Sequence, residues 1–149
     1  MLQAGVEAPA VSFTSLEGGV LERPAGPVVL AFFKVGCPTC QMAFPYLERL
    51  AQGSLRFLAI SQDNADATKR FKQKLGITFE TVLDTRDGGY AASNAFGLTN
   101  VPSIFLLEPD GRIAFSTMGF NQHDFAVLGE RAGVSPFGPD DHVPQWRAG

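Results

Sequence analysis

Hydrophobic residues follow two kinds of pattern along this chain, unbroken short runs and helical spacing. The segments 28–33 and 55–60 are apolar at nearly every position. Strands that are buried on both faces have this pattern, which is typical of parallel strands in the middle of a sheet. Shorter runs predict further strands over 81–83, 103–107 and 113–115.

Helical spacing of apolar residues fills the segments between these runs. Apolar side chains at i, i+4, i+7 and i+8, beginning at Ala43, predict a helix over 38–51. Three more helices are predicted: from a cap at Asp63 or Asn64 to Gly76, near 89–96, and from a cap at Asn121 to Gly133.

The order of these elements predicts an α/β fold. Alternating strands and helices favour a central mixed sheet whose first strands are parallel, with helices on both faces and a closing hairpin. Residues 10–22 add an N-terminal β-hairpin. With 149 residues, we expect one domain over 1–133 and a tail over 134–149, which Trp146 is expected to anchor on the body.

Composition and charge exclude several partners. The 12 basic and 15 acidic residues are interspersed and give a net charge of −3, so neither nucleic acid nor a membrane surface is expected as a partner. No apolar run is long enough to cross a bilayer, and Met1–Pro9 lacks the features of a secretory signal. We expect a cytoplasmic monomer, or a periplasmic or other extracytoplasmic protein if a leader precedes these residues in the natural protein.

The chemistry lies in Cys37-Pro38-Thr39-Cys40, at the predicted junction of a strand and a helix. Cys37 falls at the helix N-cap, where unpaired backbone N–H groups favour a thiolate and therefore a nucleophile. Cys40 lies one helical turn further on, close enough to resolve a mixed disulfide. The predicted activity is thiol–disulfide exchange by this pair.

Three other interpretations of the cysteine pair fit the sequence less well. Structural zinc normally needs four ligands, and His123 and His142 are the only further candidates, both distant. A structural disulfide that closes so short a loop stabilises little, and Cys37 in a Gly-Cys-Pro turn is poorly placed for an inert core thiol. We therefore expect no metal and no cofactor other than the redox-active Cys37–Cys40 disulfide.

Three spaced motifs carry a resemblance to a known family. They are Cys37–Cys40 followed by Phe44-Pro45-Tyr46-Leu47, Leu75–Phe79 followed by Val82–Asp84, and Phe96–Leu98 followed by Val101–Leu106 and Pro109–Ile113. Together they resemble the thioredoxin superfamily, most closely the TlpA/ResA-type thiol–disulfide oxidoreductases, a branch adjoining the AhpC/TSA peroxiredoxins. The resemblance implies a thioredoxin-like fold with an extra strand–helix insertion. It also implies exchange with protein thiols and disulfides, and an unidentified electron donor.

The resemblance also implies a substrate groove. Val101–Pro102 is expected to be a cis peptide bond beside the cysteines, with the backbone of Val101 pairing with an extended substrate. Gly119 and Phe120 are expected to flank the same groove. Gly36 stands where these proteins usually have Trp, which predicts looser substrate contacts.

Other positions near the cysteines support or limit the chemistry. Thr39 is expected to donate a hydrogen bond to a cysteine sulfur, and Lys34 to be solvated at the strand end, where its charge favours a thiolate. Ala31 and Ala43 stand where relatives carry carboxylates, so neither position can take the proton of Cys40.

The main alternative is a peroxiredoxin-like peroxidase. Its catalytic Thr three residues before the cysteine corresponds to Lys34, whose ammonium cannot accept a hydrogen bond from peroxide. A non-catalytic peptide-binding module is a weaker alternative, because both reactive cysteines are present.

Overall fold

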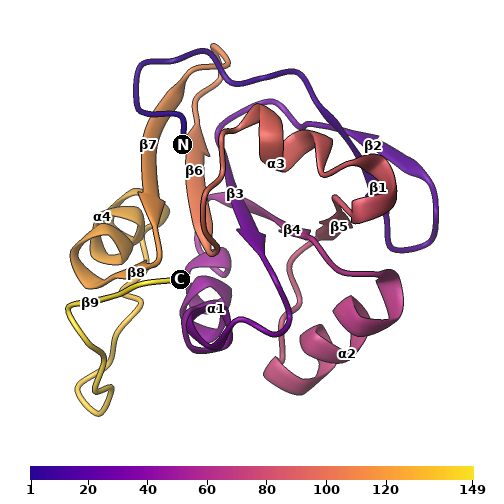
Figure 1. Ribbon diagram of the computed structural model, residues 1–149. Coiled ribbons are helices and arrows are strands. Elements are labelled where there is room, and N and C mark those ends of the chain that lie inside the picture. Colours follow the sequence, from indigo (N-terminus) through magenta and orange to yellow (C-terminus); the bar gives the residue numbers. More distant parts are fainter.

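The two longest apolar runs form neighbouring parallel strands at the centre of a seven-stranded mixed sheet (Figure 1). The computed structural model describes residues 1–149. Strand β3 spans Val28–Phe33 and β4 spans Arg56–Ser61, and all six residues of β3 are buried. Complete burial explains why β3 is apolar on both faces.

The sheet has the order β2-β1-β5-β4-β3-β6-β7. The other strands are β1 (Ser12–Ser15), β2 (Val20–Glu22), β5 (Thr81–Leu83), β6 (Ser103–Leu107) and β7 (Ile113–Met118). Strands β3, β4 and β5 run parallel, whereas the remaining neighbours pair antiparallel. The predicted mixed α/β sheet and the N-terminal hairpin are thus confirmed.

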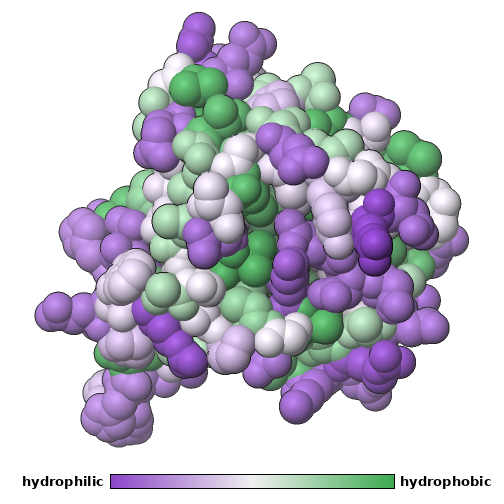
Figure 2. Space-filling view, in the orientation of Figure 1, coloured by the Kyte–Doolittle hydropathy of each residue, from purple (hydrophilic) through white to green (hydrophobic).

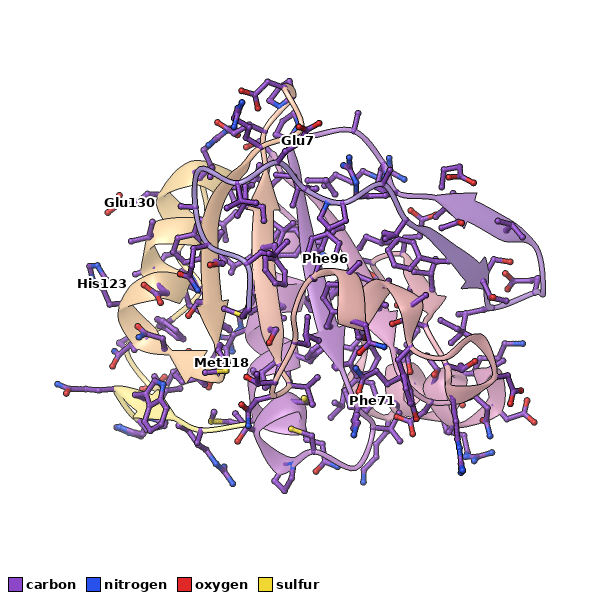
Figure 3. All side chains as sticks on the ribbon, turned by 45° about the horizontal axis from the view of Figure 1, so that its top comes forward. Glu7, Phe71, Phe96, Met118, His123 and Glu130 are labelled. Atoms are coloured by element: carbon purple, nitrogen blue, oxygen red, sulfur yellow. The ribbon has the colours of Figure 1, made fainter.

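Helices cover both faces of this sheet (Figure 1). The helices are α1 (Pro38–Ala51), α2 (Ala65–Leu75), α3 (Ala91–Ala95) and α4 (Gln122–Ala132). One hydrophobic core lies under α1, α2 and α4 and includes Phe71, and the other lies under α3 and includes Phe96. Figure 3 labels both phenylalanines. None of the four helices is long and apolar enough to cross a membrane.

Most helix ends agree with the sequence signals. Asn64, rather than Asp63, caps α2 by accepting from the N–H of Ala67, and Asn121 caps α4 in the same way. Gly76 and Gly133 follow the two helices in the left-handed conformation, with φ of 70° and 74°. Glycine adopts this conformation without strain, which explains why both helices end there.

Two predicted elements have different lengths in the structure. The helix predicted near 89–96 is shorter, because a single 3-10 turn (Arg86–Gly88) and Tyr90, with a positive φ of 51°, precede α3. Strand β7 extends to Met118, beyond the predicted end at Phe115, since its later residues continue to pair with β6.

The segment 134–149 forms a loop below α4 and then returns toward α1, where the chain ends (Figure 1). Its last part contains β9 (Trp146–Arg147), which pairs antiparallel with β8 (Phe120–Asn121). The sequence predicts that Trp146 anchors the tail on the body, but its ring does not do so. The residue is 57% exposed. Its main-chain pairing with Asn121 holds it instead.

The packing of α1 supports a test of the core beneath the cysteines. Phe44 is fully buried and its ring centroid lies 4.5 Å from that of Phe33 and 5.5 Å from that of Phe71. Phe44→Ala should lower the free energy of unfolding by about 3–5 kcal/mol, measured by urea denaturation. Val20→Ala, in a residue that is 76% exposed, is the control and should change it by less than about 0.5 kcal/mol. Equal effects of the two substitutions would contradict this account of the core.

Candidate active site

The first turn of α1 places the two cysteines. Cys37 is the N-cap, with extended backbone angles (φ −82°, ψ 115°), and Pro38 begins the helix. Proline suits this position because it has no N–H to leave unpaired and its φ already fits a helix. The N–H of Cys37 donates to the carbonyl of Lys34, closing the turn that leaves β3.

The Cys37 sulfur lies between the start of α1 and the loop before β6. It accepts the backbone N–H of Cys40 at 3.2 Å, as an N-cap side chain does. Its thiol donates to the carbonyl of Val101 at 3.5 Å. The Val101–Pro102 peptide bond is cis, the geometry expected from the sequence. Cys37 is partly exposed, and both cysteines are free thiols.

Cys40 has a different environment from Cys37. It has no exposed surface and belongs to the core under α1. Burial raises the pKa of the Cys40 thiol, and its hydrogen bond with Cys37 raises it further. Ala31 and Ala43 are also fully buried, and neither provides a carboxylate to take the proton. Cys40 is therefore a protonated thiol behind a partly exposed sulfur.

A distant carboxylate holds the loop before Cys37. Asp63 accepts the N–H of Val35 at 2.8 Å, and the side-chain amide of Gln41 donates to the carbonyl of Val35 at 2.9 Å. The sequence pattern predicts Asp63 only as a possible helix cap, and it gives no role to Gln41. No local pattern could have identified Asp63, since it lies 28 residues from Val35.

The other residues predicted to flank the first cysteine lie on the surface. Lys34, Gly36 and Pro38 are exposed, and a Cβ built on Gly36 would meet no atom within 4 Å. The side of the site at Gly36 is therefore open, in agreement with the expected loss of an aromatic wall.

Thr39 does not donate to a cysteine sulfur, and that expectation is wrong. Its hydroxyl donates instead to the carbonyl of Ala148, at 2.6 Å. The hydroxyl has one hydrogen, so this bond leaves none for sulfur. Thr39 thus connects the active-site turn to the C-terminal tail.

The predicted substrate edge at Gly119 and Phe120 is covered by the same tail. Phe120 pairs with Arg147 across β8 and β9, and its own side chain is fully buried. Gly119 is buried with φ of 73°, and a Cβ there would lie 2.5 Å from the carbonyl oxygen of Arg147. The structure brings Cys37, Thr39, Val101 and these two residues together, with the tail against them.

On the face of the molecule that Figure 2 shows, hydrophobic residues gather near the middle and more hydrophilic residues surround them. A more polar cleft of about 430 Å³ lies beside two residues that contact Cys37. Lys34, Gln62, Tyr90, Asn94, Asn100 and Val101 contribute to its wall. Lys34 and Val101 are the residues whose carbonyls accept from Cys37, so the cleft ends next to the reactive turn.

Most of the chain, including both cysteines, matches a known protein family. The model of the AhpC/TSA family matches residues 4–116, which include both cysteines and the Val101–Pro102 loop. The chain belongs to the AhpC/TSA family. The matched residues run from the segment before β1 into β7, so the match covers the whole main sheet apart from the end of β7.

Similar proteins include thiol–disulfide oxidoreductases. This AhpC/TSA protein is 28% identical over 126 residues to the thiol-disulfide oxidoreductase ResA of Bacillus thuringiensis, covering 79% of this chain and 71% of that one. The thioredoxin domain of a thiol-disulfide oxidoreductase from Bacteroides vulgatus superposes with a TM-score of 0.76 at 21% identity, over 88% and 98% of the two chains.

A secreted disulfide oxidoreductase of Mycobacterium tuberculosis superposes with a TM-score of 0.67 at 21% identity, over 82% of this chain and 96% of that one. These similarities establish the thioredoxin-like fold. Together with the family match, they make this a thioredoxin-like protein of the TlpA/ResA type.

The different burial of the two cysteines predicts selective alkylation. In the reduced protein, iodoacetamide should modify Cys37 at least about tenfold faster than Cys40, because the second sulfur is buried and protonated. At pH 9, where an ordinary cysteine thiol is half ionised, the raised pKa should keep Cys40 protonated and unmodified. Peptide mass spectrometry after timed quenching measures both rates. The protein unfolded in urea is the control, in which both cysteines should be modified at similar rates. Similar rates for Cys37 and Cys40 in the folded protein would contradict their different burial.

Proposed function

We propose that this protein is a thiol–disulfide oxidoreductase that reduces disulfide bonds in other proteins. The observation that carries the proposal is the pairing of a partly exposed cysteine at a helix N-cap with a buried cysteine one turn later. The N–H of Cys40 points at the Cys37 sulfur. A donor in this position stabilises negative charge on the sulfur that must attack.

The reaction has two exchange steps. In the first, the Cys37 thiolate attacks one sulfur of a substrate disulfide, which breaks the substrate S–S bond and releases one substrate thiolate. In the second, Cys40 loses its proton and attacks the Cys37 sulfur. The Cys37–Cys40 disulfide forms, and the other substrate sulfur leaves with the electron pair of the mixed disulfide. The released substrate thiolates take up protons.

The buried state of Cys40 supports this division of roles. A substrate sulfur can approach Cys37, whereas Cys40 is fully buried and can react only with a sulfur already bonded to Cys37. Protein disulfides are the proposed substrates, and a dithiol-bearing donor is needed to regenerate the reduced pair. No bound cofactor enters either step.

The named relatives support the same activity class. ResA and the Bacteroides vulgatus protein are both described as thiol-disulfide oxidoreductases. The monomeric state stays a prediction. The location, cytoplasmic or extracytoplasmic, stays a prediction too, and the similar Mycobacterium tuberculosis protein is a secreted one.

Replacement of each cysteine tests the proposed roles. Cys37→Ser should lower insulin reduction by at least about 10³-fold, because the attacking sulfur is lost. Cys40→Ser should instead accumulate a mixed disulfide with substrate, since the first step proceeds and the second cannot. Non-reducing electrophoresis and mass spectrometry detect that adduct. Retention of most activity by Cys37→Ser would show that the roles are assigned wrongly.

A peroxide assay distinguishes the proposed oxidoreductase from a peroxiredoxin-like peroxidase, the alternative function within the same family. Lys34 stands where peroxiredoxins have a catalytic Thr, and its side chain is exposed. We expect slow reaction of the reduced protein with hydrogen peroxide, followed by stopped-flow. Turnover at peroxidase-like rates would favour the peroxiredoxin-like function instead.

The reduction potential tests the proposed direction of electron flow. The Cys37 sulfur accepts the backbone N–H of Cys40, and the Pro38-Thr39 insert contains no His that could add a second donor. We expect a potential between those of thioredoxin, about −270 mV, and DsbA, about −120 mV. Equilibration with glutathione or dithiothreitol buffers measures it. A value near that of DsbA would contradict a reductase.

A further inference from the structure

We propose that the segment 145–149 is an internal strap that occupies the peptide-binding edge of the active site. An extended polypeptide disulfide must displace it, whereas a small disulfide can approach Cys37 through the polar cleft while the strap is docked. This role rests on the proposed oxidoreductase function, and it means that the strap hinders polypeptide disulfides more than small ones.

The strap is bound as a β-strand. Trp146 and Arg147 pair antiparallel with Asn121 and Phe120, and the carbonyl of Gln145 accepts the N–H of Gln122 at 2.9 Å. An extended peptide added to this edge would use the same main-chain groups of β8. The edge cannot pair with both at once, so substrate and strap compete.

The last two residues extend this contact to the cysteine turn. Ala148 accepts the Thr39 hydroxyl at 2.6 Å, and Thr39 is the residue directly before Cys40. Gly149 lies so close to the loop before β6 that a Cβ on it would overlap the carbonyl oxygen of Val101. That carbonyl is the one to which Cys37 donates. Figure 1 shows the C-terminus beside the start of α1.

The preceding part of the tail is tied to α1. Asp141 forms a salt bridge with Arg49 at 2.6 Å, and Arg49 also donates to the carbonyl of Pro136. Tyr46 packs against Phe137, with ring centroids 5.1 Å apart. These contacts keep the end of the chain near the site after it is displaced, which gives it a high effective concentration for rebinding.

The strap itself has the features of a segment that opens easily. All five residues from 145 to 149 are exposed, and short β8 and β9 pair only with each other. Segments with little buried surface open at low free energy compared with the core. Displacement of the strap therefore does not require unfolding of the domain.

The polar cleft remains available while the strap is docked. It lies along Lys34, Tyr90, Asn94 and Asn100, and Gly149 contributes only part of its wall. A small disulfide that enters there reaches Lys34 and Val101, the two residues whose carbonyls accept hydrogen bonds from Cys37. The structure thus gives two approaches to one sulfur, of which the strap blocks the one that suits an extended chain.

Deletion of residues 148–149 tests the strap with β8 and β9 intact. Reduced full-length and shortened proteins are compared with insulin and with the small disulfide 5,5'-dithiobis(2-nitrobenzoic acid). For insulin, kcat/KM should rise roughly fivefold as the competent open state becomes populated. The rate of Cys37 with the small disulfide should change by less than about twofold. Deletion of 145–149 should give the same pattern with a larger rise.

Trp146→Ala is the matched control, since it changes an exposed side chain and keeps the main-chain pairing. It should leave both rates within about twofold of those of the parent protein. An unchanged insulin rate after both deletions, or an equal rise for both disulfides, would overturn the strap. A full-length protein that reacts with neither disulfide through Cys37 would instead overturn the proposed function. Thermal unfolding of each variant excludes loss of the fold as the cause.

Discussion

The need of helix α1 for a cap at its first turn is the constraint on which the site depends. The first N–H groups of a helix have no partner within it, and here the Cys37 sulfur satisfies that of Cys40. One contact thus does two things: it ends the loop from β3 and places a donor on the sulfur that reacts. Because β3 is completely buried and Phe44 fixes α1 in the core, the turn that joins them is held on a rigid base.

The chemistry follows from the different depths of two side chains on that turn. Cys37 lies at the surface end, and Cys40 lies one turn inward with no exposed area. The same burial that protects the second sulfur also disfavours its charged form. Neither Ala31 nor Ala43 offsets this effect with a carboxylate, so the proton of Cys40 must leave to a group at neither of these positions.

The tail changes what the site can contact. A sheet edge with free N–H and C=O groups attracts other strands, and proteins commonly cover such edges. Here the cover is the chain's own end, and it extends past β8 to Thr39 and Val101. The residues proposed for main-chain recognition of a substrate are therefore residues that the tail contacts.

Most of the helices and strands and the reactive pair could be predicted from the amino-acid sequence alone, because they depend on neighbours in the chain. Buried runs predicted β3 and β4, Asn121 and Gly133 marked the ends of α4, and the spacing of Cys37 and Cys40 indicated their chemistry. The position of the tail and the partner of the Thr39 hydroxyl could not be predicted in this way, because both depend on long-range contacts. The two-residue strands β8 and β9 have no periodicity to detect, and Thr39 meets a carbonyl 109 residues away. Local patterns report which face of an element is buried, whereas a hydrogen bond between distant segments depends on how all the elements pack.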